Sequence, residues 1–193
     1  MTKERLGKIV FSLRSYTPIP FLLAALVWSR VSWGSYFSGL ALVISGEAVR
    51  LWAVSIAGPM TRMKNVGAAE LITAGPFAHT RNPLYSGNFL IGCGFCIMSW
   101  ALMPWLLMGF VFAFFVQYSL IVLHEEEFLK EKFGVKYSEY AHDVPGIFPR
   151  FNPYKKRSGP VPSIVRGLKS ERRTLQTIVL LLVLFIARRL LQS

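Results

Sequence analysis

Residues 84–123 read LYSGNFLIGCGFCIMSWALMPWLLMGFVFAFFVQYSLIVL, a run that contains no Asp, Glu, Lys or Arg. A helix needs about 20 mostly apolar residues to cross the roughly 30 Å hydrocarbon core of a bilayer. The run is long enough for two such helices, and Pro104 near its middle cannot continue a helix smoothly. We therefore expect spans at about 84–103 and 104–123, joined by a tight helical hairpin.

Further apolar segments flank this pair along the chain. Two precede it, at about 18–33 and 35–56. A fifth segment, at 175–187, is shorter than a full span and can either cross the bilayer or lie in its interface. The sequence thus predicts an all-α, polytopic membrane protein with four or five transmembrane helices.

The composition agrees with this fold class. Hydrophobic residues make up 53% of the chain, charged residues make up 17%, and the mean hydropathy is +0.43, which is too apolar for an ordinary soluble domain. Cys93 and Cys96 both lie in the apolar run, which excludes a disulfide framework and a four-ligand zinc site. We expect one domain over residues 1–193, with a core at 35–150 and a basic connector and apolar helix at 151–193.

The distribution of cations predicts the orientation, because basic loops are retained on the cytosolic side. The opposite connections are nearly uncharged and hold Trp33, Trp100 and Trp105, which suits the far interface. We expect a cytosolic N-terminus, in a bacterial inner membrane or the endoplasmic reticulum, although Arg188 and Arg189 disagree if the fifth segment crosses. The cytosolic groups are Lys3, Arg5, Lys8 and Arg14 before the first span, Arg62, Lys64 and Arg81 between the second and third, and eleven Lys and Arg within 124–173.

The net charge of +12 raises the question of a nucleic-acid partner. The cations lie beside predicted spans, so attraction to anionic lipid accounts for them without DNA or RNA. We expect the membrane itself as a partner and no nucleic acid.

The first polar stretch runs from Leu71 to Asn88 and ends at the mouth of the third span. Pro83 suits the first turn of a helix, which places Asn82 where an N-cap residue would satisfy the helix-end donors. Arg81 could serve as an anchor at the membrane surface.

The second polar stretch, at 124–145, leaves the fourth span on the same side. Three successive carboxylates begin it, and acidic groups there meet the negative end of the helix dipole. The compensation could be an i, i+4 pair of Glu126 with Lys130, a bound cation, or a polyhydroxylated ligand. His124, Glu127 and Glu131 would share one helix face, but no recognised metal motif surrounds them and we expect no metal.

These two stretches carry a resemblance. Arg81-Asn-Pro-Leu-Tyr-Ser-Gly87, followed by Glu125-Glu126-x-x-Leu129-x-x-x-Phe133-Gly134-x-x-Tyr137-x-x-Tyr140 and Val144-Pro145, resembles the isoprenylcysteine carboxyl methyltransferase and phospholipid N-methyltransferase superfamily of integral-membrane methyltransferases. The usual Arg-His-Pro of that superfamily is Arg-Asn-Pro here, which removes an imidazole base at position 82. Gly92-Cys93-Gly94 could correspond to the Gly-x-Gly of the phospholipid branch.

The resemblance implies methyl transfer from S-adenosylmethionine, entered from the cytosol, to a lipid, prenylated or otherwise hydrophobic acceptor entered from the bilayer. A carboxylate pair would hold the ribose hydroxyls and stabilise the ammonium and sulfonium, while Arg81 and Asn82 would meet the cofactor carboxylate. Glu126 is the candidate base for an amine acceptor. We expect Arg81 and Glu126 as catalytic residues, and a cofactor site made of His79, Arg81, Asn82, Tyr85, Gly87, Glu125, Glu126, Tyr137 and Tyr140.

Several of these residues also have a purely structural interpretation. Tyr137 and Tyr140, at i and i+3, could pack against the membrane surface, and Gly87 could serve close helix packing, as could Gly92 and Gly94. Glu47 and Arg50 lie within a span, where they favour a structural ion pair over a contact with a substrate head group.

Two other functions are compatible with the pattern. Membrane sterol reductases resemble this architecture and bind a nicotinamide cofactor instead, which makes an NADPH-dependent reductase the first alternative. The second is a membrane scaffold without catalysis, whose charged residues would only set the topology.

Overall fold

The computed structural model describes residues 16–58 and 70–192, and in those ranges it contains helices and no strand. The predicted all-α class is confirmed. Lys3, Arg5, Lys8, Arg14, Arg62 and Lys64, on which part of the predicted orientation rests, lie outside the described residues. The elements are α2 (Pro18–Val27), α3 (Trp33–Ala57), the short 3-10 helix η2 (Gly75–Ala78), α4 (Pro83–Ser99), α5 (Trp105–Phe133), α6 (Val135–Asp143) and α7 (Ile164–Leu191).

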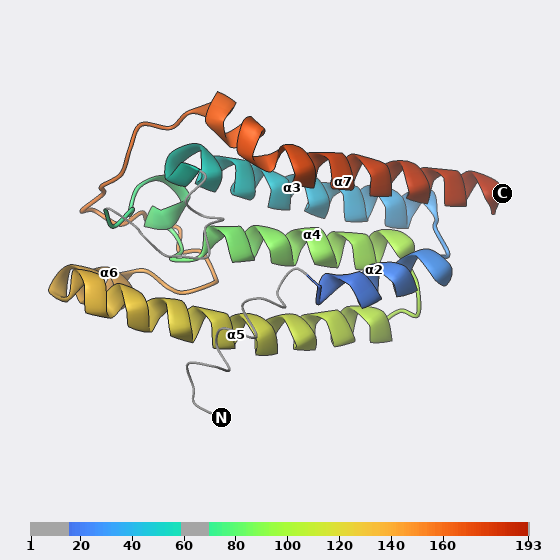
Figure 1. Ribbon diagram of the computed structural model, residues 1–193. Coiled ribbons are helices and arrows are strands. Elements are labelled where there is room, and N and C mark those ends of the chain that lie inside the picture. The colour runs from blue at the N-terminus through green and yellow to red at the C-terminus, as the bar shows by residue number, and fades with distance from the viewer. Residues whose placement is uncertain (1–15, 59–69, 193) are drawn as a thin grey trace.

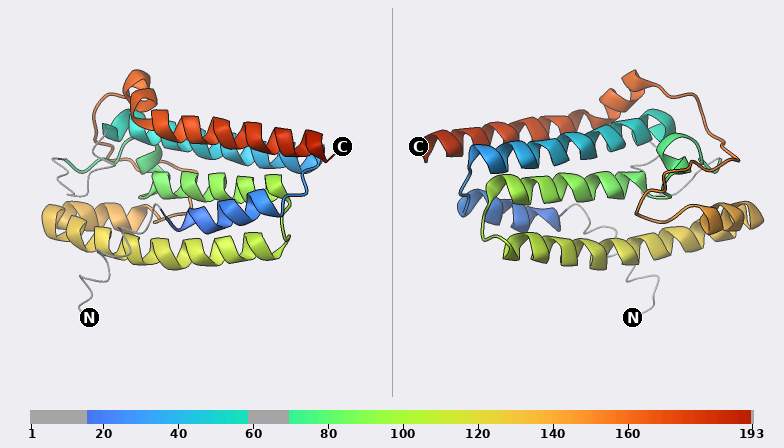
Figure 2. Two further views of the ribbon diagram at one scale, coloured as in Figure 1. Left: turned by 45° about the vertical axis from the view of Figure 1, so that its right-hand side comes forward. Right: turned by 180° about the vertical axis from the view of Figure 1, so that it is seen from behind.

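The long helices run side by side in one bundle, with α4 between α3 and α5 and with α7 along the outside of α3 (Figure 1). The shorter α2 packs against α4 and α5. The connections at 70–82 and 134–163 lie together at one end of the bundle, and those at 28–32 and 100–104 lie at the other (Figure 2). The polar stretches therefore share one end, as the sequence predicts.

Three helices are long and apolar enough to cross a membrane, namely Trp33–Ala57, Trp105–Phe133 and Ile164–Leu191. The expected spans at 18–33 and 84–103 are shorter in the structure, because α2 has 10 residues and α4 has 17. At about 1.5 Å per residue, α2 reaches only half of a bilayer core. The segment after α2 turns back toward α3, whose start is fixed by a capping box between Ser32 and Ser35.

The hairpin predicted at Pro104 is present. Helix α4 ends at Ser99, Trp100 adopts a left-handed conformation, and α5 begins at Trp105 directly after Pro104. Proline cannot continue the preceding helix, which explains why the turn falls at this point.

The fifth apolar segment belongs to a much longer helix than expected, because the polar residues before it are also helical. Helix α7 has 28 residues and runs antiparallel along α3, and it does not lie across the end of the bundle (Figure 1). The two arginines in its last turn, Arg188 and Arg189, make contacts at the far end of the bundle. Arg188 Nε donates to Ser29 Oγ at 3.0 Å, and the Arg189 guanidinium lies 5.7 Å from the centre of the Trp33 ring.

Helices α3 and α4 approach each other closely through paired glycines. A Cβ atom on Gly87 would lie 2.7 Å from the Gly46 carbonyl oxygen, and one on Gly46 would lie 2.6 Å from the Gly87 carbonyl oxygen. Gly39 and Gly94 meet in the same way further along the two helices. Small residues let two helix backbones come together, and this contact fixes α4, which begins at the polar end.

Candidate cofactor site

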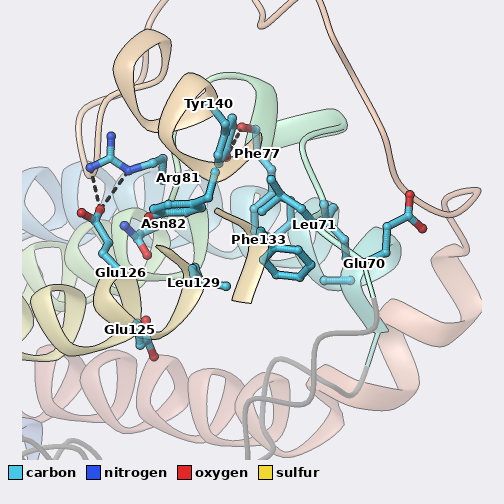
Figure 3. A pocket seen from close by; sticks show the side chains of 13 residues that line it. Glu70, Leu71, Phe77, Arg81, Asn82, Glu125, Glu126, Leu129, Phe133 and Tyr140 are labelled. Atoms are coloured by element: carbon cyan, nitrogen blue, oxygen red, sulfur yellow. Dashed lines mark hydrogen bonds and ion pairs between the residues drawn. The ribbon is translucent and has the colours of Figure 1, made fainter. Parts of the chain in front are cut away.

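Arg81 lies at the centre of the polar end, directly before α4. Its Nε donates to Glu126 Oε1 at 2.9 Å, and its Nη2 lies 2.5 Å from the same oxygen (Figure 3). Its Nη1 donates to the carbonyl oxygens of Ala141, at 2.8 Å, and of Val144. The Arg81 side chain thus joins the C-terminal part of α5 to the end of α6.

The hydrogen bonds of Arg81 leave little of the guanidinium unused. The group has five N–H donors, and four of them serve Glu126 and the two carbonyl oxygens. Arg81 compensates the Glu126 carboxylate, a partner that was not among the alternatives of a Lys130 pair, a bound cation and a polyhydroxylated ligand. The two carboxylate oxygens of Glu126 differ in their hydrogen bonds. Oε1 accepts from Arg81, whereas Oε2 accepts no hydrogen bond from another described residue.

The loop after α6 covers the start of α4. The backbone N–H groups of Arg81 and Asn82 donate to the carbonyl oxygens of Pro145 and Gly146, at 2.9 and 3.1 Å. Asn82 occupies the N-cap position as expected, but its side chain does not cap the helix. Its Nδ2 instead donates to the Gly146 carbonyl oxygen at 3.0 Å, because this loop already lies across the helix start. The two sequence motifs, around Arg81 and around Pro145, are therefore in direct contact.

A pocket of about 180 Å³ lies beside this ion pair (Figure 3). Arg81, Glu125 and Glu126 lie toward one side of the pocket, whereas Glu70 lies apart from them, beyond the apolar side chains of Leu71 and Phe77 (Figure 3). A few polar groups in a largely apolar lining are typical of sites that bind small organic molecules. The lining residues are Ala57, Glu70, Leu71, Ile72, Phe77, Arg81, Asn82, Glu125, Glu126, Leu129, Phe133, Tyr137 and Tyr140.

Tyr137 and Tyr140 belong to the pocket wall and are buried, at 1% and 3% exposure, so they do not lie on the membrane surface. Tyr140 donates its hydroxyl to the Phe77 carbonyl oxygen at 2.7 Å. The Tyr137 hydroxyl makes no hydrogen bond of normal geometry to another described residue. Burial and the nearby Glu126 carboxylate raise the pKa of Tyr137 to about 12, although the Arg81 guanidinium acts in the opposite direction.

Tyr85 lies next to the pocket without lining it. Its hydroxyl donates to Glu125 Oε1 at 2.8 Å, and its ring packs on that of Tyr118 with the centroids 4.5 Å apart. Tyr85 therefore orients a carboxylate of the pocket wall from the side of α4.

The structure places two of the expected cofactor-binding residues away from the pocket. His79 Nδ1 lies 2.8 Å from the Arg150 carbonyl oxygen, and its ring is 6.1 Å from that of Trp52. Gly87 packs against Gly46 and the Arg50 side chain in the α3–α4 contact. Neither residue lines the pocket. For Gly87, the interpretation as a residue of close helix packing accounts for its position.

The basic connector is ordered by contacts with the pocket end. The Tyr154 amide donates to the Ala78 carbonyl oxygen, and Thr73 exchanges hydrogen bonds with Ser158. Ser158 also donates to Glu70, a pocket residue that the sequence analysis missed. No sequence pattern around Glu70 indicates that it lines the pocket, because its position depends on a loop that is far away in the sequence.

A second polar cluster inside the bundle was predicted only in part. The expected pair of Glu47 with Arg50 is present, with Oε2 and Nε 3.4 Å apart. The sequence analysis missed Glu171 of α7, whose Oε2 lies only 2.6 Å from Arg50 Nη2. The available signal was that Glu171 is the single acidic residue in the sequence of α7.

His124, Glu127 and Glu131 do not form a metal site. Within residues 16–58 and 70–192, no group of three or more His, Cys, Asp or Glu side chains is arranged to hold a metal ion. The expectation that the protein uses no metal stays a prediction.

Comparison with known proteins adds independent information. Residues 35–136 match the phospholipid methyltransferase family. The cobalt-zinc-cadmium resistance protein CzcN of Cupriavidus metallidurans is 32% identical over 148 residues, which cover 72% of this chain and 64% of that protein. A probable protein-S-isoprenylcysteine O-methyltransferase of Oryza sativa subsp. indica is 31% identical over 136 residues, which cover 67% of this chain and 70% of that protein.

Another plant protein gives a similar match. Protein-S-isoprenylcysteine O-methyltransferase B of Arabidopsis thaliana is 31% identical over 124 residues, which cover 62% of this chain and 61% of that protein. No solved structure matches the chain.

Proposed function

This chain belongs to the phospholipid methyltransferase family, a family of methyl-transferring enzymes, and from that premise we propose its reaction. It transfers a methyl group from S-adenosylmethionine to a lipid or lipid-modified acceptor at the cytosolic end of the bundle. One observation carries the proposal: Arg81 and the Glu125–Glu126 pair, from distant parts of the chain, meet at the wall of one pocket.

The chemistry of the pocket suits this cofactor. The carboxylates of Glu125 and Glu126 would accept hydrogen bonds from the ribose hydroxyls and stabilise the positive ammonium and sulfonium groups. The hydroxyl of Tyr137, beside the Arg81 guanidinium, would serve as a donor to the cofactor carboxylate. The apolar wall would take the adenine.

The bound cofactor supplies an electrophilic methyl group, and in-line displacement needs chiefly proximity and the exclusion of water. The chain contributes a fixed base for an acceptor that must lose a proton. Arg81 holds Glu126 through Oε1, which leaves Oε2 to receive the proton. A carboxylate acceptor would need no base.

The acceptor is proposed to come from the bilayer because α5 exposes apolar side chains next to the pocket. Leu120 and Leu123 are 38% and 61% exposed, and they lie on α5 within two helical turns before the pocket residues Glu125 and Glu126. An acyl or prenyl chain that packs along these side chains would bring its head group to the two carboxylates.

The first test is ligand binding to the purified protein in detergent. Isothermal titration calorimetry is expected to detect S-adenosylhomocysteine and to detect no binding of NADPH. Binding of NADPH alone would instead support the reductase alternative, which neither the family match nor the three relatives' names suggest. Binding of neither ligand would overturn the proposal.

The second test identifies the acceptor. Native membranes that contain the protein are incubated with S-adenosylmethionine carrying an isotopically labelled methyl group, and the extracted lipids are analysed by mass spectrometry. We expect label in a lipid or lipid-modified species, and a Glu126→Gln protein expressed to the same level is the control. Equal labelling in both samples would contradict the assignment of Glu126.

A further inference from the structure

A chain of polar contacts runs through the bundle from α7 toward the pocket. Glu171 Oε2 of α7 accepts from Arg50 Nη2 of α3 at 2.6 Å, and Arg50 Nη1 donates to the Asn88 side-chain oxygen on α4. Asn88 Nδ2 then donates to the Tyr118 hydroxyl of α5 at 3.3 Å. Four helices thus contribute one residue each.

The last link of this chain reaches the pocket wall. The Tyr118 ring packs on the Tyr85 ring at 4.5 Å between centroids, and Tyr85 donates to Glu125 Oε1 at 2.8 Å. Glu125 lines the pocket. A displacement of Arg50 or Asn88 would therefore change the support of the two rings and the direction of the Glu125 carboxylate.

The charged residues in this series of polar contacts are deeply buried. Glu171 is 1% exposed, and the side chains of Arg50 and Glu47 are 11% and 8% exposed. Burying charges is costly, and well-packed apolar residues often give equal or greater stability in such places. Stability alone therefore does not explain why α7, which has no other acidic residue, carries this one carboxylate.

We propose that Glu171 is a positioning residue for the cofactor pocket. By holding Arg50 and Asn88 in place, it fixes the packed Tyr118 and Tyr85 rings, which are tilted by 55° to each other, and thereby the orientation of Glu125. This inference rests on the proposed function, since the direction of Glu125 matters only if the pocket holds the cofactor.

A double-mutant cycle on cofactor affinity tests the proposal. The dissociation constant of S-adenosylhomocysteine is measured for the wild type, Glu171→Gln, Tyr85→Phe and the double variant, all purified in the same detergent. Each single change is expected to weaken binding roughly fivefold to tenfold, and the double variant is expected to be at most about twofold weaker than Tyr85→Phe, because both changes interrupt one connection.

Ile178→Ala is the matched control, because Ile178 is also buried on α7 but lies outside the polar chain. It is expected to lower the unfolding temperature and to leave the affinity for S-adenosylhomocysteine unchanged. If Glu171→Gln behaves like this control, or if its effect multiplies with that of Tyr85→Phe, Glu171 is not a positioning residue.

If Glu171→Gln fails to fold, Asn88→Ala is a second variant that interrupts the same series of polar contacts. It removes the link between Arg50 and Tyr118 without changing the charge of the buried cluster, and the same lack of additivity with Tyr85→Phe is expected. Multiplying effects would overturn the inference. Absence of binding by the wild type would overturn the proposed function, and this result is distinct from normal binding that is insensitive to Glu171.

Discussion

Arg81 and Glu126 are 45 positions apart in the sequence, and their side chains form an ion pair with Nη2 and Oε1 2.5 Å apart. The pair is 16% exposed on both sides, so it lies at the boundary between the bundle and the pocket. Because Arg81 also binds two carbonyl oxygens at the end of α6, this pair determines how α5, α6 and the start of α4 are arranged around the pocket.

The fork of the Arg81 guanidinium is expected to be necessary for methyl transfer. Arg81→Lys keeps the charge, but a single ammonium group cannot serve Glu126 and two carbonyl oxygens in the same geometry. Methyl transfer to membrane lipids should fall by roughly tenfold or more, which corresponds to about 1.4 kcal/mol or more of lost stabilisation. Arg150→Lys, outside the pocket lining, is the control, and equal activity of the two variants would contradict the prediction.

The neighbouring carboxylates of α5 are expected to differ in importance. Glu126→Gln removes the charge that pairs with Arg81, whereas Glu127→Gln changes an exposed residue outside the pocket lining. We expect Glu126→Gln to lose at least about 90% of the rate of methyl transfer and Glu127→Gln to keep the wild-type rate. A filter assay with labelled S-adenosylmethionine compares the two, and similar rates would show that the ion pair is dispensable.

Substitution of Gly87 tests the α3–α4 contact. Gly87→Ala would place a methyl group against the Gly46 carbonyl oxygen and should destabilise the protein by about 1–3 kcal/mol. Gly109→Ala on α5 is the control, because its added methyl group meets only Phe21, at 3.6 Å, an ordinary contact. Thermal unfolding in detergent should show a lower midpoint for Gly87→Ala alone, and an unchanged midpoint would contradict the packing.

Tyr137 is expected to make stability decrease at high pH. Its pKa is raised from 10.0 to about 12 in the folded protein, so at a pH between these values the unfolded chain has lost the phenolic proton and the folded chain has kept it. The unfolded state then binds fewer protons, and the free energy of unfolding falls as pH rises from about 10 toward 12. Urea unfolding across this range should be less pH-dependent for Tyr137→Phe, and an equal dependence would exclude a raised pKa.

Local sequence patterns predicted the features that depend on local chemistry. A proline in an uncharged run indicated the hairpin at Pro104, and a proline after an asparagine indicated the start of α4 at Pro83. The meeting of Arg81 with Glu125 and Glu126 was predicted from the resemblance and from the ends of the spans, and the pocket contains all three residues.

Features that depend on tertiary contacts were predicted less well. Capping of α4 was one of two interpretations of the Asn82 side chain, but this side chain instead donates to the loop at Gly146. Glu171 pairs with Arg50 across 121 positions, and no periodicity within α7 could indicate which helix would lie beside it. The length of α7 was underestimated for a similar reason, since its polar first half is helical beside α3 although it is not apolar.

The placement of Glu171 also has a consequence for biosynthesis. Helices α3 and α4 leave the ribosome well before α7, so Arg50 enters the bilayer with Glu47 and Asn88 as neighbours and meets its third partner only later. The delivery of α7 therefore completes the charge pairing among the earlier helices. An assembly intermediate that lacks α7 would leave Arg50 without the Glu171 carboxylate, which is costly for an ionised group within a bilayer.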